Sequence, residues 1–151
     1  MNVEVTYGDP RSEAAYRLLK GSHDLMTALF PVGACHFLSV DALCGDDIRF
    51  FVAVDGDLTL GCGALKIRDG YGEVKSMFVD PQARGRAVGS AILARVEAEA
   101  RALELPVLNL ETGTKLDAAH RMYDRAGFTR CEKFGDYVDS AFSIFMTKAL
   151  T

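Results

Sequence analysis

The chain has 151 residues, 49% of them hydrophobic and 25% charged, which is typical of one globular domain and excludes a disordered or fibrous chain. Its net charge of −4 argues against a general affinity for nucleic acid, because binding to phosphate backbones requires a basic face. No apolar run has the roughly 18 to 20 residues of a membrane helix, and the N-terminal residues lack the pattern of a secretory signal.

We therefore expect one cytoplasmic domain that spans residues 1–151 and binds neither nucleic acid nor a membrane. The cysteines form no C-x-x-C pair and have no histidine at ligand spacing. They are Cys35, Cys44, Cys62 and Cys131. We expect buried free thiols and no metal site.

The N-terminal part is expected to be helical. Between residues 11 and 31, apolar residues recur at helical offsets, with Gly21 among them. This pattern predicts two consecutive helices that end at Pro31.

Three β-rich runs follow. Asp55 and Gly56 separate the first two runs, and an Asp-Gly pair is a strong hairpin signal. A second turn at residues 68–70 leads into the run 71–79. Together the runs predict an antiparallel meander, to which residues 3–7 can add a further strand.

Helices and strands alternate in the second half of the chain. Apolar residues from Val88 onward predict an amphipathic helix that Pro106 stops. A short strand over residues 106–112 precedes a second helix, which is expected to end at Gly127 in a left-handed cap. Two β-rich segments complete the chain.

The stretch VDPQARGRAVGSAIL connects a predicted strand to a predicted helix. A helix N-terminus exposes unpaired N–H groups and carries about half a positive charge, so it attracts phosphate. Gly85, Ala87 and Gly89 keep large side chains away, while Arg84 and Arg86 add forked donors. The stretch indicates an anion-binding loop or, alternatively, a glycine-rich turn with solvated arginines.

Two other phosphate-binding motifs are missing from the sequence. A P-loop needs Gly-Lys followed by Ser or Thr, and the chain has no such run. A dinucleotide fingerprint fails because Lys66 stands where the third glycine after Gly61 and Gly63 belongs.

Several segments, in the correct order, resemble motifs of the GNAT superfamily of N-acetyltransferases. Arg84-x-x-Ala87-x-Gly89 is similar to the family motif [QR]-x-x-G-x-[GA], with alanine where the family usually has glycine. GEVKSMFVDPQARGRAVGSAIL resembles the fourth strand and third helix, LNLETG the fifth strand, and AAHRMYDRAGF the A-x-x-x-Y-x-x-x-G-F signature. The resemblance implies an α/β (α+β) fold with a mixed, mostly antiparallel central sheet flanked by helices on both faces.

The resemblance also implies acetyl transfer from acetyl-coenzyme A, a cosubstrate, to a primary amine of a small molecule or peptide. Backbone N–H groups of the loop are expected to hold the pyrophosphate. The pantetheine arm is expected along strand four, which diverges from strand five at a bulge in this family. The implied coenzyme-binding residues are Met77, Phe78, Val79, Arg84, Gly85, Arg86, Ala87, Val88, Gly89 and Ser90.

Acetyl transfer requires a group that removes a proton from the acceptor amine, and two carboxylates are candidates for this role. An alkyl amine with a pKa of about 10.4 is almost fully protonated at pH 7, so a base or a water chain should remove its proton. By resemblance, Glu73 and Glu111 are the candidate bases. Strand alternation puts Glu73 on the face of Lys75 and Met77. Alternatively, Glu73 faces solvent in an ion pair with Lys75 or an arginine, and Glu111 bonds to a neighbouring loop.

Tyr123 matches the signature tyrosine, which implies that its phenol protonates the leaving thiolate. The alternative is a core aromatic that packs with Met122 and Phe128. Leu116 stands where some family members have an asparagine that contacts pantetheine. Tyr137 lies in the loop that often lines the acceptor site of this family, and we expect it to bind the substrate.

None of the histidines His23, His36 and His120 is expected to be catalytic. The acidic chain mildly favours a cationic acceptor. A homodimer is possible, because the alternating run 142–146 can lie at a subunit contact or in a core.

Two other functions compete with catalysis. A non-catalytic acyl-coenzyme A sensor or structural module would keep the fold without turnover. A nucleotide-binding protein using the same loop would be stabilised by ATP or NAD at least as much as by coenzyme A.

Overall fold

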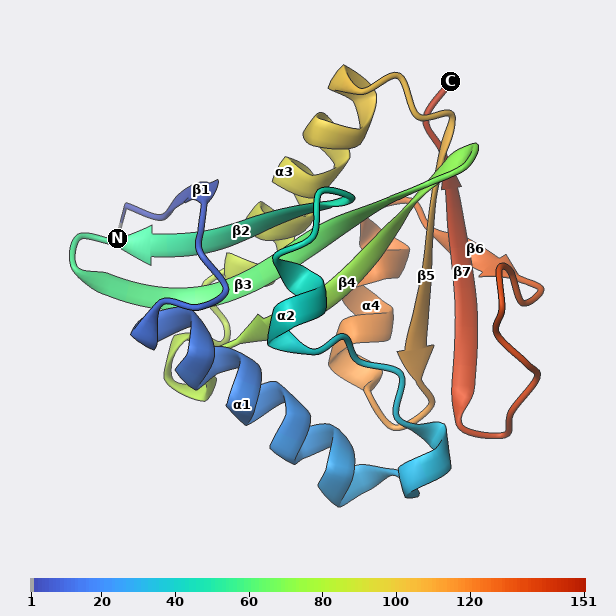
Figure 1. The fold of residues 1–151 in the computed structure, drawn as a ribbon, viewed down its shortest axis with the longest axis horizontal. Helices are drawn as coiled ribbons and strands as arrows, with labels where there is room; N and C mark the ends of the chain where they lie inside the picture. The colour runs from blue at the N-terminus through green and yellow to red at the C-terminus, as the bar shows by residue number, and fades with distance from the viewer. Residues whose placement is uncertain (1) are drawn as a thin grey trace.

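The computed structural model describes residues 2–151, which form one mixed sheet with helices on both of its faces (Figure 1). The seven strands lie in the order β1-β2-β3-β4-β5-β7-β6. β4 and β5 pair in parallel, whereas the other neighbouring strands are antiparallel. The strands are β1 Glu4–Tyr7, β2 Ile48–Asp55, β3 Leu58–Arg68, β4 Tyr71–Val79, β5 Val107–Gly113, β6 Thr129–Cys131 and β7 Ser143–Ala149.

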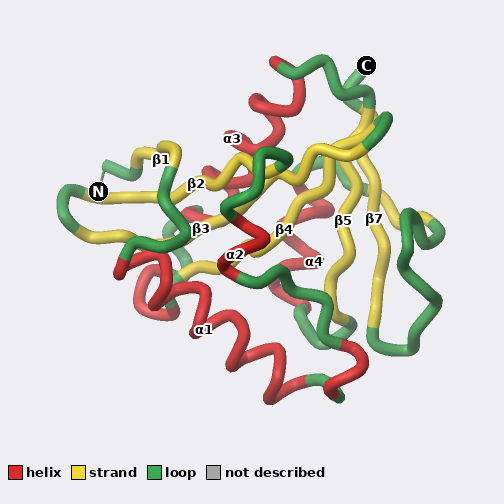
Figure 2. Tube along the Cα trace, in the orientation of Figure 1, coloured by secondary structure: helices red, strands yellow, loops and turns green. Residues whose placement is uncertain are grey.

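α1 and α2 cover one face of the sheet, and α3 and α4 cover the other (Figure 1, Figure 2). The helices are α1 Glu13–Leu29, α2 Val40–Leu43, α3 Val88–Ala102 and α4 Asp117–Arg125, with short 3-10 turns at Val32–Ala34 and Pro81–Ala83. The expected fold class, a mostly antiparallel sheet between helices, is confirmed.

α1 is one helix, and the expectation of two helices separated near Gly21 was wrong. Ser12 caps it by accepting a hydrogen bond from the Ala15 N–H at 3.2 Å. Gly21 lies inside the helix, where an added Cβ would come within 3.3 Å of the Phe78 ring on β4. The glycine therefore allows α1 to approach the sheet, and does not end the helix.

Two hydrophobic clusters fill the spaces between the sheet and its helices. Phe50 and Phe51 of β2 point into different clusters, because successive strand residues face opposite sides of a sheet. The cluster under α3 and α4 includes Phe51, Leu65, Val74, Ile92, Leu108 and Met146. The cluster under α1 and α2 includes Leu18, Leu19, Leu43, Phe50 and Cys62.

β4 contains an irregularity at Ser76, whose backbone is left-handed with φ 55°. The register between β3 and β4 shifts at the same place. On the other side, β4 pairs with β5 at Gly72–Leu108 and Glu73–Asn109. Beyond Glu73 the two strands diverge, as expected from the resemblance.

The bulge changes which residues share a face of β4. Lys75 lies on the side of α1, where its Nζ donates to the His36 carbonyl oxygen at 3.1 Å. Met77 instead packs against the cluster under α3 and α4. The expectation that Met77 shares a face with Glu73 and Lys75 was therefore wrong, because the extra residue reverses the alternation.

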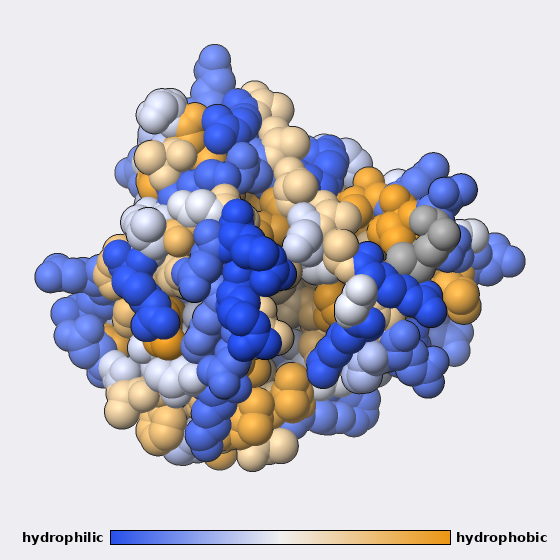
Figure 3. Space-filling view, turned by 180° about the vertical axis from the view of Figure 1, so that it is seen from behind, coloured by the Kyte–Doolittle hydropathy of each residue, from blue (hydrophilic) through white to orange (hydrophobic). Residues whose placement is uncertain are grey.

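The outer surfaces of the molecule are mainly polar. Figure 3 shows the rear face, where hydrophilic side chains dominate and hydrophobic ones gather only in patches. None of the helices within residues 2–151 is long and apolar enough to span a membrane. β7 lies inside the sheet between β5 and β6, so the alternation of residues 142–146 is that of an interior strand.

Candidate active site

The segment expected to bind an anion combines an exposed loop with the first turn of α3. Gly85 (φ 83°) and Ala87 (φ 60°) have left-handed backbones, and residues 84–87 are exposed. The first intrahelical bond here runs from the Ala91 N–H to the Ala87 carbonyl oxygen, at 3.1 Å. The N–H groups of residues 88–90 therefore precede the helical ladder and have no acceptor within the helix.

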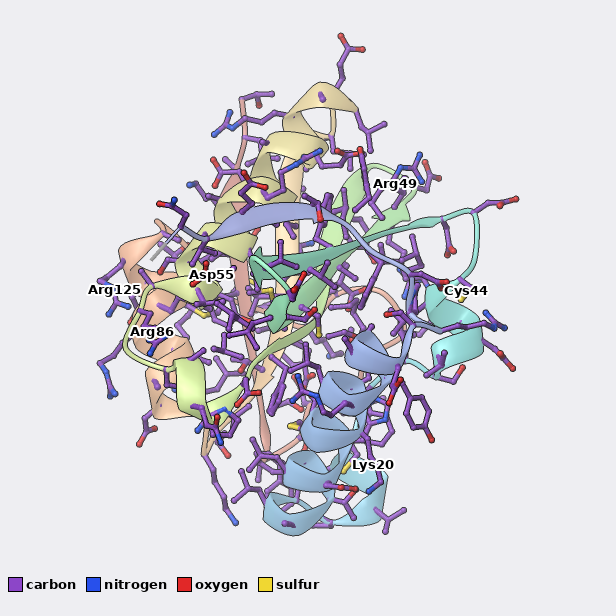
Figure 4. The ribbon with its side chains drawn as sticks, turned by 90° about the vertical axis from the view of Figure 1, so that its left-hand side faces the viewer. Lys20, Cys44, Arg49, Asp55, Arg86 and Arg125 are labelled. Atoms are coloured by element: carbon purple, nitrogen blue, oxygen red, sulfur yellow. The ribbon has the colours of Figure 1, made fainter. Side chains whose placement is uncertain are left out.

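Arginines and a close helix contact surround this loop. The Arg84 guanidinium lies 6.0 Å from the centre of the Phe78 ring. Figure 4 shows Arg86 on the loop and Arg125 on α4, both on the left-hand side of that view. A Cβ added to Gly89 would come within 2.8 Å of the Met122 Sδ on α4. Gly89 thus serves the packing of α3 on α4, a role that its motif position did not indicate.

The divergence of β4 and β5 leaves part of β4 without a strand neighbour on one side. This part includes Met77, Phe78 and Val79, which still pair with β3 on the other side through Phe78 and Val79. The Ser76 hydroxyl is buried and has no hydrogen-bond partner among the described residues. An extended ligand can therefore pair with this edge as an added strand would.

Glu73 is fully buried, with 0% of its surface exposed. Its Oε2 accepts a hydrogen bond from the Tyr137 hydroxyl at 2.6 Å and lies 3.5 Å from the Lys75 Nζ. The Arg68 Nε lies 3.4 Å from Oε1. Two cations and a phenol thus contact the Glu73 carboxylate. The alternative of a solvent-facing Glu73 is wrong, although the pairing with Lys75 and an arginine is present.

Glu111, near the end of β5, occupies a different environment. Its Oε2 accepts a hydrogen bond from the Ser143 hydroxyl at 2.7 Å and lies 3.3 Å from the His36 Nδ1. Its side chain is 7% exposed, whereas that of His36 is 25% exposed. The contact joins β5 to the connection between α1 and α2, and it matches the alternative in which Glu111 bonds to a neighbouring loop.

Tyr123 lies on α4 and is buried. Burial, and then the nearby negative charge of Glu111, raise the pKa of Tyr123 well above its usual value. Its ring packs edge-on against Phe128 at 5.8 Å between centres. No hydrogen bond of its hydroxyl is present among residues 2–151. The Tyr123 ring therefore packs in the core, and its protonated hydroxyl makes no hydrogen bond within the described residues.

Tyr137 stands between the two carboxylates. Burial and its hydrogen bond to Glu73 raise the pKa of Tyr137 far above that of a free phenol, and the charge of Glu111 adds to the effect. Its ring meets those of Phe134, Phe145 and His36 edge-on, with centres 5.2, 5.5 and 5.3 Å apart. The loop before β7 is thereby fixed against the open end of the β4–β5 gap.

His36 is the residue of this cluster that the sequence analysis missed. It comes from a connection with no regular pattern, and nothing in the run ACHFL points to a site. His120, by contrast, has a structural role, because its Nε2 lies 2.7 Å from the Gly113 carbonyl oxygen. Leu116 precedes α4 as its N-cap residue without a side-chain hydrogen bond.

Two surface cavities lie away from this cluster. The larger, of about 350 Å³, lies between the β1–α1 connection and the start of β2, and its lining includes Tyr7, Pro10 and Cys44. The smaller, of about 210 Å³, lies beside α1 and includes Tyr16 and His23. No group of three or more His, Cys, Asp or Glu side chains within the described residues could hold a metal ion.

The comparison with family models decides the classification. A model described as an acetyltransferase (GNAT) domain matches residues 46–130, more than half of the chain. The chain belongs to the GNAT family. As a GNAT protein it is an N-acetyltransferase, and the resemblance found in its motifs is confirmed.

Individual GNAT proteins are similar over the whole chain. The IAA acetyltransferase of Azospirillum brasilense is 39% identical and is matched over 99% of each chain. A Klebsiella pneumoniae structure, provisionally described as an acyl-CoA N-acyltransferase, has a TM-score of 0.83 at 28% identity, over 99% of this chain and 98% of the other. PaiA N-acetyltransferase from Thermoplasma acidophilum, in complex with coenzyme A, shares the fold with a TM-score of 0.76 at 14% identity, over 99% of both chains.

Proposed function

We propose that this protein transfers the acetyl group of acetyl-coenzyme A to a primary amine of a small molecule or peptide. The observation that carries the proposal is the gap between β4 and β5, which has the unengaged Tyr123 phenol near it and the Glu111–His36 pair at its open end. A thioester in that gap would lie between a proton donor and a proton acceptor.

The residues present fit coenzyme A. The unpaired N–H groups of residues 88–90 suit a pyrophosphate, with Arg84 and Arg86 adjacent. The free edge of β4 and the unsatisfied Ser76 hydroxyl suit a pantetheine arm, which carries amide groups. When bound, acetyl-coenzyme A supplies an acetyl group on a good leaving group. The chain supplies binding, orientation and proton transfer.

Tyr123 is the proposed general acid. A phenol with a pKa of about 10 is already protonated at neutral pH, and burial raises the pKa of Tyr123 further. Its hydroxyl has no competing hydrogen-bond partner among residues 2–151. Protonation of a departing thiolate by a placed side chain typically contributes about 10²- to 10⁴-fold to the rate.

The structure favours Glu111 over Glu73 for the basic side of the reaction. Glu73 is enclosed, and Arg68, Lys75 and Tyr137 hold its charge. Both of its oxygens already have partners, and none of its surface is exposed to an incoming amine. Glu73 then serves to fix Tyr137, which we propose lines the acceptor site.

The decisive experiment measures thiol release with acetyl-coenzyme A and a panel of amines, in the wild-type protein and in Tyr123→Phe. The amine panel includes polyamines, amino acids and a lysine peptide, and IAA, after which the Azospirillum relative is named, is tested beside it. We expect turnover with at least one primary amine and a loss of about 10²-fold or more in kcat for Tyr123→Phe, with coenzyme affinity preserved.

Other outcomes would contradict the proposal. Tight coenzyme binding without thiol release on the whole panel would indicate a sensor. Stabilisation by ATP or NAD equal to that by coenzyme A, measured by thermal shift, would indicate a nucleotide-binding protein.

A further inference from the structure

The connection between α1 and α2 brings a histidine to the open end of the β4–β5 gap. The His36 Nδ1 lies 3.3 Å from the Glu111 Oε2. Its other ring nitrogen, Nε2, has no hydrogen-bond partner among residues 2–151 and is not one of the buried unsatisfied atoms. One nitrogen of the ring therefore faces a buried carboxylate, and the other is accessible.

Several contacts fix the orientation of this ring. The Lys75 Nζ bonds to the His36 carbonyl oxygen at 3.1 Å, and the imidazole packs edge-on against Tyr137. The Ser143 hydroxyl donates to the same Glu111 oxygen at 2.7 Å, so the carboxylate is held in turn. The ring, its partner and the three residues that hold them come from five segments of the chain, so their positions are defined before any substrate binds.

We propose that His36 accepts the proton of the acceptor amine and that Glu111 positions it. This inference rests on the proposed function and assigns its base. With Nδ1 facing a carboxylate, the neutral ring keeps its proton on Nδ1, donates it to Glu111, and presents the lone pair of Nε2 outward. Glu111 also stabilises the imidazolium that forms. Glu73 cannot take this role, because it is enclosed and paired.

The proton balance is complete with the groups present. The acceptor ammonium gives one proton to the His36 Nε2, and its nitrogen bonds to the acetyl carbon as the carbon–sulfur bond breaks. Tyr123 gives a proton to the departing sulfur, which keeps the electron pair of the broken bond. Tyr123 then regains a proton from the acceptor nitrogen through solvent, and His36 releases its own proton to water. The products are an amide, a thiol and one proton.

The activity test uses pH to separate a base from a structural residue. An unperturbed amine loses its own proton near pH 10.4, so a missing base matters less as the pH rises. We expect His36→Gln to lower kcat/KM by about 10²-fold or more near pH 7, with a deficit that shrinks steadily toward about pH 9.5. The charged or titratable groups that contact His36 are Glu111, Lys75 and Tyr137, and Glu73 lies behind the last two as their shared partner.

A matched control distinguishes loss of the base from loosening of its connection. His23 stacks on Phe37 with 4.0 Å between ring centres and does not contact Glu111. His23→Gln removes this support and should change kcat/KM by a small factor that does not vary with pH. A His36→Gln deficit that stays constant across the pH range would overturn the proposal, whereas failure of the wild-type protein to turn over any amine would overturn the proposed function instead.

A second readout needs no turnover. ¹⁵N chemical shifts of His36 report which ring nitrogen carries the proton. We expect the Nδ1–H tautomer in the wild-type protein and a shift toward the Nε2–H tautomer in Glu111→Gln, whose amide can donate to Nδ1. An Nε2–H tautomer in the wild-type protein would contradict the proposal, because no lone pair would then face the acceptor.

Discussion

Ala87 carries a methyl group at a backbone position that favours glycine. Its φ of 60° and ψ of 23° are left-handed, and such a conformation costs a residue with a Cβ roughly 1–2 kcal/mol. Ser76 shares this feature, with φ 55° at the bulge of β4. Two of the three non-glycine residues with left-handed backbones among residues 2–151 therefore border the proposed coenzyme site, and the third, Glu104, follows α3.

Because the backbone of Ala87 is strained, an alanine-to-glycine substitution should have opposite effects on stability at Ala87 and at Ala94. Ala87→Gly should raise the free energy of unfolding by about 0.5–1 kcal/mol, because relief of the left-handed penalty exceeds the added entropy of the unfolded chain. Ala94→Gly, on the exposed face of α3, should lower it by about 1 kcal/mol. Denaturant titration measures both. Destabilisation by both substitutions would show that Ala87 is not strained.

The end of β5 and the end of α1 meet at the candidate site. A Cβ added to Gly113 would overlap the ring of Phe30, the C-cap residue of α1. Phe30 is buried and leads directly into the connection that carries His36. The Lys115 Nζ also donates to the Leu29 carbonyl oxygen at 3.0 Å. The position of His36 thus depends on packing between elements that are distant in the sequence.

Gly113→Ala tests this dependence. The methyl group must displace the Phe30 ring, so we expect a loss of about 1–3 kcal/mol in the free energy of unfolding and a fall in kcat/KM as His36 moves. Gly33→Ala provides the control, since nothing lies within 4 Å of its added Cβ, and it should change the free energy of unfolding by less than about 0.5 kcal/mol. Equal effects of the two substitutions would contradict the coupling of Phe30 to the site.

Across the whole molecule, side chains link the two helical layers to the loops at the sheet edges. The Asp80 carboxylate, just before the coenzyme loop, accepts hydrogen bonds from the Gln82 N–H at 3.0 Å and from the Arg17 guanidinium of α1 at 2.9 Å. On the other side of the sheet, the Lys148 Nζ of β7 bonds to Glu97 of α3 at 2.6 Å. Each link joins separate layers through an ion pair.

The Asp80 link makes stability depend on pH. The hydrogen bond from Gln82, followed by that from Arg17, lowers the pKa of Asp80 in the folded protein. Because the pKa of Asp80 is lower in the folded protein, its carboxylate stabilises the fold at pH values above the unfolded pKa of about 3.9. This contribution is lost as the pH falls through the folded pKa. Asp80→Asn should therefore lower the melting temperature at pH 6 to 7 by a few degrees. The difference from wild type should shrink below about pH 4, and a difference that grew in acid would contradict the assignment.

Local sequence patterns determined much of this protein. The hairpin signals, the helix after the loop, the left-handed Gly127 and the family motifs depend on residues close together in the chain. Periodicity and turn chemistry act over that range. Local patterns failed at Gly21, which was interpreted as a break between two helices. A side chain at this position would contact the Phe78 ring on β4, which is distant in the sequence.

Only the tertiary structure decided how the candidate site is arranged. The sequence offered Glu73 as the first candidate base and Glu111 as the second, but burial and cross-strand partners separate them into a carboxylate enclosed by two cations and one that faces a histidine. The bulge at Ser76 decided the orientation of Met77. His36 lies at the site on a connection whose sequence has no regular hydrophobic period. These properties arise from contacts between residues far apart in the chain, which no local pattern encodes.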